Sequence, residues 1–201
     1  MLVIKMVNYP NKKNNTKNIP LTPQQKKVSA SHRGISFEED INLSNQYYLS
    51  NKIATIHKKP TPVQIVKVDY PSRKAAKIIE AYFKTPSTTD YNGVYKGKYI
   101  DFEAKETKKM TLPLANIHPH QIKHLKDVLR QKGIAFLLIA FASINEVYLL
   151  EADYVISAFN NQEIKSIKYE EVKLHGYLIK QGYLPRLNYL SIIDYLYFKE
   201  D

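Results

Sequence analysis

The chain contains no cysteine and no tryptophan among its 201 residues. Without cysteine it can form neither a disulfide framework nor a zinc site built on thiolates. The continuous apolar run at residues 134–142 is too short to span a membrane, and the N-terminus lacks the apolar block of a signal peptide. We therefore expect a cytoplasmic protein without membrane contact, and its length suffices for one domain with a substantial core.

Acidic residues are also scarce. The chain carries 19 Asp and Glu against 30 Lys and Arg, for a formal net charge of +11 and an isoelectric point of about 9.5. A surplus of this size favours nucleic acid or an anionic membrane surface as the partner. General basicity of the kind found in ribosomal proteins would give the same composition, so charge alone does not establish the function.

The basic surplus begins at the N-terminus, where no acidic residue precedes Glu38. Residues 1–32 are rich in Asn, Lys, Pro and Ser, and we expect a disordered basic arm that follows phosphates. A merely solubilising tail would have this composition too. Arg33 is a candidate DNA contact at the junction with the folded part, which we expect to form one domain over residues 33–201.

The sequence pattern of residues 33–201 predicts an α/β fold with a mixed central β-sheet flanked by helices. Ser36 and Glu39 form a capping-box pattern that begins the first helix, and Gly133 ends a later amphipathic helix. That later helix lies between a strand and a fully apolar strand, which is the order of a crossover unit. The expected helices span residues 37–50, 72–83, 121–132, 151–160 and 183–198, and the expected strands 53–57, 63–69, 90–95, 98–105, 134–142 and 146–150.

Residues 58–87 form a basic insertion just before the most specific pattern in the chain. We expect it to project as a stalk that grips the substrate, although an ordinary solvated basic face has the same charge. Its candidate DNA contacts are Lys58, Lys59, Arg73, Lys74 and Lys77.

The most specific pattern lies on two short strands joined by Lys96-Gly97. If this dipeptide is a two-residue hairpin loop, Asp90 lies directly opposite Glu103. Thr88 then lies opposite Lys105. Paired side chains share a face about 4.5–5.5 Å apart, and two carboxylates at that distance repel unless a cation lies between them. The pattern therefore predicts a metal-dependent hydrolase.

Three alternatives to this assignment stay open. Asp101 shares a face with Glu103 and could replace Asp90 as the second carboxylate. A β-bulge would change the register. A solvated hairpin face on which acids and lysines alternate would need no metal at all.

Phosphodiester hydrolysis with Mg²⁺ suits these residues. Mg²⁺ takes oxygen ligands and is usually held by one or two carboxylates together with water and substrate phosphate. We expect Asp90 and Glu103 to be its ligands, with the backbone carbonyl of Ala104 beside them. Lys105 would orient the water or stabilise charge in the transition state, and Thr88 and Gln121 are further candidate contributors.

The order of Asp90, Glu103-x-Lys105 and a following helix resembles the PD-(D/E)xK pattern of nucleases with a restriction-endonuclease-like fold. Longer stretches are more specific, and they resemble the RecU family of bacterial Holliday-junction resolvases. These stretches are Thr88–Gly93, Tyr99–Thr107 and His118–Gln121, and the likeness extends from Arg33 to about Arg186. Thr89 stands where the wider superfamily usually has proline, a departure that RecU-like sequences share.

The resemblance implies a structure-selective endonuclease of homologous recombination and repair that resolves four-way DNA junctions by paired symmetric nicks. It implies a homodimer whose nuclease domain carries a projecting stalk, with recombinase and branch-migration proteins as partners in the nucleoid. By motif, the ligands of Mg²⁺ would be Thr88, Asp90, Glu103 and Gln121. Mn²⁺ could substitute for Mg²⁺. Lys105 would be the transition-state stabiliser, and Glu38 and Glu39 could add a carboxylate behind the metal ligands.

The rival interpretation is a non-catalytic architectural protein that binds DNA or RNA through its basic surface. In that case the face that carries Asp90 and Glu103 is simply solvated. A divalent metal would then leave the stability of the protein unchanged.

Overall fold

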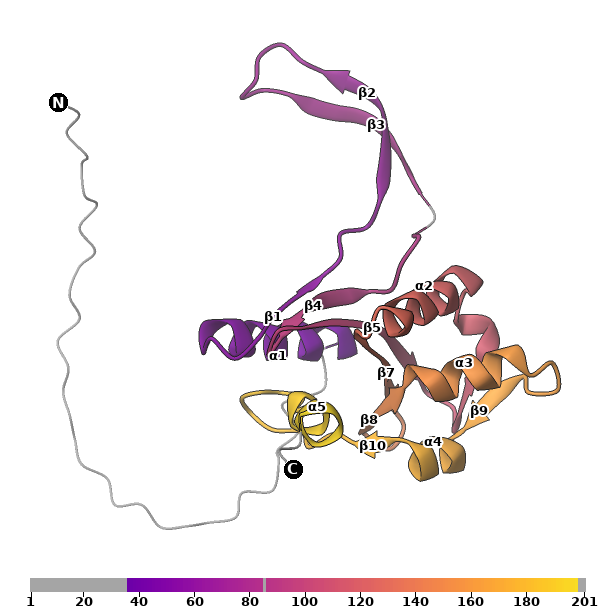
Figure 1. Ribbon diagram of the computed structural model, residues 1–201. Coiled ribbons are helices and arrows are strands. Elements are labelled where there is room, and N and C mark those ends of the chain that lie inside the picture. Colours follow the sequence, from indigo (N-terminus) through magenta and orange to yellow (C-terminus); the bar gives the residue numbers. More distant parts are fainter. Residues whose placement is uncertain (1–35, 85, 199–201) are drawn as a thin grey trace, which may run out of the picture. The chain divides into compact units, whose positions relative to one another are not determined.

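The computed structural model describes residues 36–84 and 86–198. The expected basic arm at residues 1–32 and the candidate contact Arg33 lie outside the described residues. Six strands form the main sheet in the order β1-β4-β5-β7-β8-β10 (Figure 1). Their bounds are Thr55–Lys58 for β1, Tyr91–Tyr95 for β4, Lys98–Thr107 for β5, Ile134–Phe141 for β7, Glu146–Glu151 for β8 and Tyr177–Leu178 for β10.

The main sheet is mixed because one pair of neighbouring strands runs parallel. β5 and β7 are parallel and are joined by helix α2 (Pro119–Arg130), whereas the other neighbouring strands are antiparallel. A parallel connection needs a crossover of this kind, while the antiparallel pairs β4–β5 and β7–β8 are closed by short turns. The predicted crossover unit and the predicted α/β class with a mixed central sheet are confirmed.

Apolar side chains cover both faces of the main sheet. Along β7, Phe136 and Leu138 belong to one core, and Leu137 and Ile139 belong to the other. This alternation buries every residue of β7, as its continuous apolar sequence predicts. The first core is closed by α1 (Phe37–Ser50) and α5 (Leu190–Tyr197), and the second by α2, α3 (Ala152–Asn160) and α4 (Tyr169–His175) (Figure 1).

Several short elements were not predicted. β6 (Thr111–Pro113) pairs with β9 (Ser166–Lys168) in a separate two-stranded sheet, and the 3₁₀ helix η1 (Leu114–Asn116) follows β6. Strand β10 and helix α4 were also missed, since none of these five elements is long enough to show a clear period in the sequence.

Over the ranges that the structure describes, no helix is long and apolar enough to cross a membrane.

Helix α1 begins where the capping-box pattern predicts. The Ser36 side chain accepts a hydrogen bond from the Glu39 amide at 3.2 Å. The buried face of the helix includes Ile41 and Tyr48. The Tyr48 hydroxyl donates to the carbonyl of Leu187 at 2.8 Å, which ties α1 to the C-terminal segment across the first core.

The C-terminal helix is shorter than predicted. Helix α5 starts at Leu190, so residues 183–189 of the helix expected at 183–198 are not helical. Pro185 explains the difference, because proline has no amide hydrogen to donate and disfavours a helical conformation in the residue before it. Gln181 and Leu187 form an isolated antiparallel bridge in this stretch.

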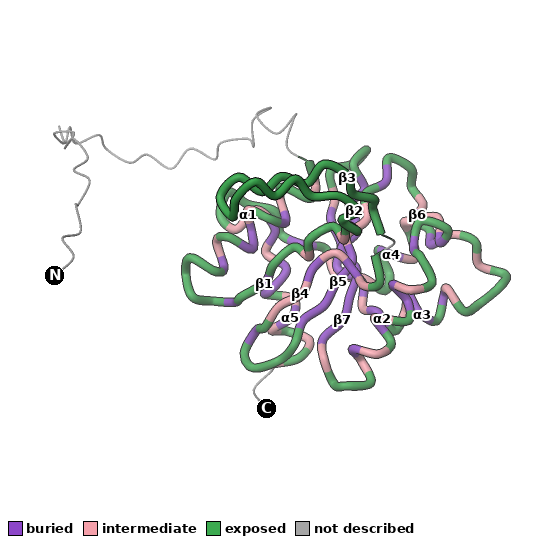
Figure 2. The backbone as a smooth tube through the Cα atoms, turned by 90° about the horizontal axis from the view of Figure 1, so that it is seen from above, coloured by how far each residue is buried: buried purple, intermediate pink, exposed green. Residues whose placement is uncertain are grey.

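The basic insertion is a β-hairpin, and the helix expected at residues 72–83 is wrong. Strand β2 (Val63–Asp69) pairs with β3 (Lys77–Phe83) in a two-stranded sheet of its own. The β-branched and aromatic residues of β3, such as Ile78 and Tyr82, favour a strand when a partner strand is available. Both strands are exposed along their whole length (Figure 2). Because neither strand packs on a core, the spacing of apolar residues at 72–83 does not report the secondary structure, and the helix predicted from it is absent.

Gly93 permits the close approach of β4 to β1. A Cβ atom at this position would lie 2.1 Å from the carbonyl oxygen of Thr55 and 2.6 Å from the Cα of Ile56. Both neighbours are backbone atoms that cannot move aside, so the spacing requires glycine. The constraint concerns the site directly, because β1 leads into the inserted hairpin and β4 follows Asp90.

Candidate active site

The turn between β4 and β5 sets the register of the site. Lys96 and Gly97 both have positive φ angles, 46° and 76°, as a two-residue hairpin loop requires. Tyr95 pairs with Lys98 and Tyr91 with Phe102, which is the predicted register without a bulge. Asp90 directly precedes β4, and its Oδ2 accepts a hydrogen bond from the amide of Ala104 at 3.2 Å. The Asp90 carboxylate is thereby held beside the strand segment that carries Glu103.

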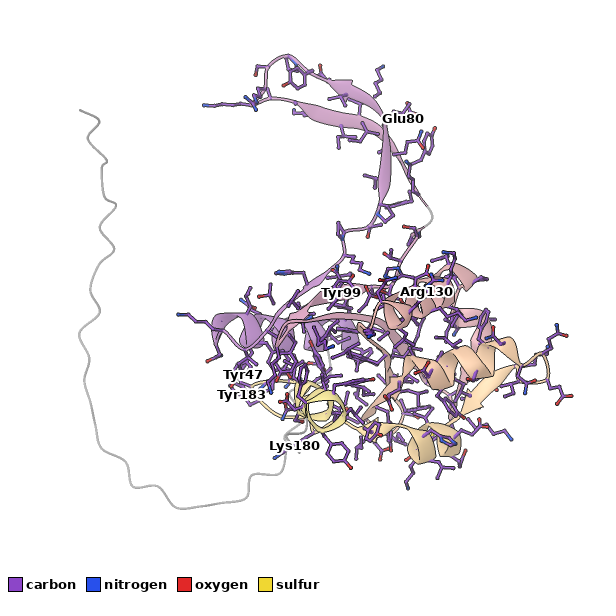
Figure 3. The ribbon with its side chains drawn as sticks, in the orientation of Figure 1. Tyr47, Glu80, Tyr99, Arg130, Lys180 and Tyr183 are labelled. Atoms are coloured by element: carbon purple, nitrogen blue, oxygen red, sulfur yellow. The ribbon has the colours of Figure 1, made fainter. Side chains whose placement is uncertain are left out.

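Strand β5 divides its side chains between the core and the site. Ile100 and Phe102 lie in the core that α1 and α5 close. The alternate residues Asp101, Glu103 and Lys105 face the side of α2, since successive residues of a strand point to opposite faces. Figure 3 labels Tyr99 of β5 and Arg130 of α2, which mark the strand and the helix that border this region.

Glu103 is fully buried, and its two carboxylate oxygens differ. Oε1 accepts a hydrogen bond from Gln121 Nε2 at 2.6 Å and pairs with Lys105 Nζ at 2.7 Å. Oε2 is also buried but has no hydrogen-bond partner among the described residues. The pKa of Glu103 is raised from 4.5 to about 7, chiefly because the carboxyl is buried and next because Asp90 carries a negative charge, while Lys105 opposes the shift.

This arrangement fits a divalent cation. A buried carboxylate oxygen without a donor is costly, and a second carboxylate nearby makes the ionised state costlier still. A cation between Glu103 and Asp90 would remove both costs. Within the part of the chain that the structure describes, no three His, Asp or Glu side chains converge on one point. The donor set therefore suits Mg²⁺, which needs only one or two carboxylates, better than an ion that requires an all-protein cage.

Asp101 belongs to a different group of side chains. It is fully buried, and its Oδ1 accepts a hydrogen bond from the Thr89 hydroxyl. Its Oδ2 lies 2.7 Å from Lys59 Nζ, 2.9 Å from the Tyr99 hydroxyl and 3.0 Å from His124 Nε2. Both oxygens of Asp101 are therefore occupied, and Glu103 is the carboxylate that the structure brings together with Asp90.

The other expected metal ligands have protein partners. Gln121 completes a capping box at the start of α2, where its Oε1 accepts from the His118 amide at 2.9 Å while its Nε2 donates to Glu103. The Thr88 hydroxyl lies 3.4 Å from the carbonyl oxygen of Thr89. The structure thus brings Gln121 and Lys105 to Glu103, and ligation by Thr88 and Gln121 stays a prediction.

The expected DNA contacts and outer carboxylates occupy three kinds of position. Lys58 is half-exposed and pairs with Glu38 at 2.7 Å, and the Glu39 amide is used by the cap of α1. Lys59 points inward to Asp101, with 17% of its side chain exposed. The remaining expected contacts are exposed at the turn of the inserted hairpin and the start of β3, and they are Arg73, Lys74 and Lys77.

Sequence reasoning missed the group around Asp101. Tyr99 and Asp101 are two residues apart on one strand, and His124 follows Gln121 by three residues on α2, so both spacings point to a shared face. Lys59 and Thr89 come from the two ends of the insertion. Only the pairing of β1 with β4 brings these ends together, and that pairing has no local signal in the sequence.

Comparison with known proteins assigns the family. A family model described as "Recombination protein U" matches residues 32–195, which include every described element from α1 to most of α5. The chain belongs to the RecU family. A RecU relative from Bacillus cytotoxicus, named "Holliday junction resolvase RecU", is 56% identical over 197 residues that cover 96% of this chain and 98% of the relative. A relative of the same name from Bacillus thuringiensis is 54% identical over the same coverage.

Among solved structures, this RecU-family chain is similar to Archaeoglobus fulgidus Hjc, described as a Holliday junction resolvase from an archaeal hyperthermophile. The TM-score is 0.43 at 13% identity, over 70% of this chain and 91% of that chain. A likeness at this level carries no argument. The family assignment rests on the family model and on the two relatives.

The variant Glu103→Gln tests the burial of the ionised carboxylate in the metal-free protein. The pKa of Glu103 is raised from 4.5 to about 7 on folding, so its contribution to stability is fully present below pH 4.5 and is lost as the pH rises through about 7. In EDTA we expect the free energy of unfolding of the wild type to fall by about 3 kcal/mol between these two pH values, relative to that of Glu103→Gln. The glutamine variant shows no such fall because it has no proton to lose. Urea unfolding of both proteins across the interval measures the difference.

Glu106→Gln is the matched control for this measurement, because Glu106 lies on the same strand but is exposed. It should follow the wild type. Parallel pH dependences for the wild type and Glu103→Gln would contradict the prediction.

Proposed function

We propose that this protein resolves four-way DNA junctions by Mg²⁺-dependent hydrolysis of phosphodiester bonds. The observation that carries the proposal is the buried Oε2 of Glu103, which has no donor within residues 36–84 and 86–198, next to Asp90 and on the face that also holds Lys105. The junction as substrate is supported by the name of the two relatives, each "Holliday junction resolvase RecU". The exposed hairpin with its basic turn, which lies between β1 and Asp90 in the chain, supports a nucleic-acid substrate independently of that name.

Asp90 and Glu103 would hold the metal ion, with the carbonyl of Ala104 beside them. When bound, Mg²⁺ supplies positive charge to the scissile phosphate and lowers the pKa of a coordinated water. Gln121 and Lys105 both engage Oε1 of Glu103, which leaves Oε2 as the oxygen available to the ion. The amide of Ala104 holds Oδ2 of Asp90 and so fixes the second carboxylate relative to the first.

Lys105 would stabilise the charge that develops on the phosphate. Its ammonium group lies 2.7 Å from Glu103 and is about one-fifth exposed, so it is close to the carboxylates yet accessible to a substrate. A fixed charge in a partly buried site stabilises a transition state more strongly than the same charge in water.

The variant Lys105→Ala separates cleavage from binding. We expect the rate of junction nicking in Mg²⁺ to fall at least about 100-fold, because a preorganised charge near the reacting phosphate is lost. Junction affinity should survive. The measurement compares nicking of a mobile four-way junction and of a linear duplex, in Mg²⁺ and in EDTA, with gel-shift binding of the same junction.

Lys123→Ala is the control, since Lys123 is an exposed lysine that also pairs with a carboxylate, Asp127. It should nick at the wild-type rate. Wild-type nicking by Lys105→Ala would remove Lys105 from the reaction. Binding without nicking by the wild type in Mg²⁺ would instead favour the architectural, non-catalytic role.

The turn of the inserted hairpin is proposed to contact phosphates. Arg73 and Lys74 are exposed in this turn, and Lys77 follows at the start of β3. For Arg73→Ala combined with Lys74→Ala, we expect weaker junction binding and a salt dependence whose slope, log Kd against log salt, is smaller by up to about 2. Binding titrations over a series of salt concentrations measure the slope.

The matched control removes two exposed lysines elsewhere, Lys173→Ala with Lys180→Ala. It changes the net charge by the same amount and should leave the slope unchanged. Equal slopes for the hairpin variant and the wild type would exclude the turn from the phosphate contacts.

We also propose that the protein acts as a homodimer, because paired nicks on symmetric strands need two sites related by a two-fold axis. The inserted hairpin supports this proposal. An isolated two-stranded hairpin is marginally stable in water, yet Val68 and Ile78 pair across it with 43% and 56% of their surface exposed. A second copy of the hairpin would cover such side chains.

Sedimentation equilibrium tests this assembly. The variant Val68→Thr with Ile78→Thr keeps β-branched residues but makes the surface polar, and it should weaken the dimer about 10-fold or more, since about 0.8 kcal/mol is lost per buried CH₂ group. The control is Val94→Thr, which alters an exposed valine of β4 and should sediment like the wild type. A monomeric wild type at all concentrations would contradict the proposal.

A further inference from the structure

Asp101 is a buried carboxylate that the proposed reaction does not use. It is fully buried, and four side chains contact it, Lys59, Thr89, Tyr99 and His124. Lys59 Nζ also donates to the Thr89 hydroxyl at 2.9 Å, so the donors contact one another as well as the carboxylate. We call these five residues the Asp101 group.

Two members of the Asp101 group come from opposite ends of the inserted hairpin. Lys59 directly follows β1, where the chain leaves the main sheet for the hairpin, and Thr89 lies where it returns. The backbone continues this link, because the Lys59 amide donates to the carbonyl of Asp90 at 2.8 Å. Farther out, the Lys84 amide donates to the carbonyl of Pro62 at 3.0 Å. Asp101 therefore fastens both legs of the hairpin at its base.

Stability alone does not explain this group. Desolvation of a buried ion pair offsets most of its attraction, and well-packed apolar residues are often at least as stabilising at such positions. A fully satisfied polar group does impose one arrangement, because every donor has a defined acceptor and a shift of any member leaves a buried polar atom unpaired. The consequence of the Asp101 group is a fixed geometry at the base of the hairpin.

The residue whose geometry is fixed in this way is Asp90. It follows Thr89 in the chain, and its own carbonyl accepts from Lys59, so two of its restraints come from the Asp101 group. Its third restraint is the hydrogen bond from the Ala104 amide to its carboxylate. Asp90 is therefore connected to both legs of the hairpin, to one through the chain at Thr89 and to the other through the hydrogen bond from Lys59.

We propose that Asp101 is a positioning residue that couples the two legs of the inserted hairpin to the placement of the Asp90 carboxylate. The proposal rests on the proposed function, since it assigns to Asp90 a part in the reaction. DNA held by the hairpin would act on the cleavage site through Lys59 and Thr89, and Asp101 makes the legs and Asp90 move as one unit. Asp101 itself is fully buried among its four partners, so it acts through Lys59 and Thr89.

The variant Thr89→Val tests the link, because it keeps the shape of the side chain and removes the donor to Asp101. We expect the single-turnover nicking rate at saturating protein to fall about 10- to 100-fold, as small misplacements of a reacting group do. The Kd for the junction should stay unchanged. Thr89→Ser, which restores the hydroxyl, should recover the wild-type rate.

A structural readout that needs neither metal nor cleavage is the amide exchange of Ala104. This amide donates to Asp90, so its exchange should accelerate in Thr89→Val and in Asp101→Asn, while the amides of Leu138 in β7 and of Leu149 in β8 exchange as in the wild type. Faster exchange across all three strands would mean that Asp101 only stabilises the sheet, and would overturn the proposal. Wild-type nicking and wild-type Ala104 exchange in both variants would overturn it too.

The control is Asp194→Asn. Asp194 also accepts hydrogen bonds from a tyrosine and a lysine, Tyr95 and Lys96, but neither belongs to a leg of the hairpin. This variant should nick, bind and exchange at Ala104 like the wild type. If the wild-type protein binds junctions without nicking them, the proposed function fails, whereas the Ala104 measurement still decides whether Asp101 positions Asp90.

Discussion

The burial of charge on strand β5 is the constraint on which the site depends. β5 lies between β4 and β7 inside the main sheet, and its alternate side chains must satisfy opposite requirements. Ile100 and Phe102 enter an apolar core, while Asp101 and Glu103, two residues apart, carry carboxylates into the other face at 0% exposure. A buried carboxylate is tolerated only when it is paired, hydrogen-bonded or protonated. How each of the two meets this requirement determines what each can do.

The two carboxylates meet it in different ways. Asp101 has one hydrogen-bond partner on Oδ1 and three on Oδ2, so both of its oxygens are held in place. Among the described residues, Glu103 has donors on Oε1 alone and none on Oε2, and the pKa of its carboxyl is raised to about 7 by burial and by Asp90. A buried oxygen with no donor among the described residues, beside a second carboxylate, is a position that a cation would stabilise. Asp101, two residues from Glu103, has partners on both oxygens and instead holds the surrounding side chains in place.

Much of this arrangement could be predicted from the sequence, because the signals are local. Lys96-Gly97 fixes the turn and hence the pairing of Tyr91 with Phe102, and the fully apolar β7 predicts a strand covered on both faces. The failures occur where local signals conflict with distant partners. β3 has apolar residues at helical spacing, and only its pairing with β2 makes it a strand. The Asp101 group was not predictable for the same reason, since Lys59 and Thr89 meet only when β1 pairs with β4.

The place of the hairpin in the chain follows from these contacts. An insertion that merely enlarged the basic surface could leave the fold at any exposed turn, where added residues cost little. This one leaves at Lys59 and returns at Thr89, directly before the carboxylate of Asp90, and both ends are attached to a residue two positions from Glu103. Gly93 brings β1 and β4 close enough for this attachment, because a side chain there would meet the backbone of β1. Because Thr89 directly precedes Asp90 and the Lys59 amide donates to the Asp90 carbonyl, both legs of the hairpin and Asp90 are attached to the same segment of the sheet.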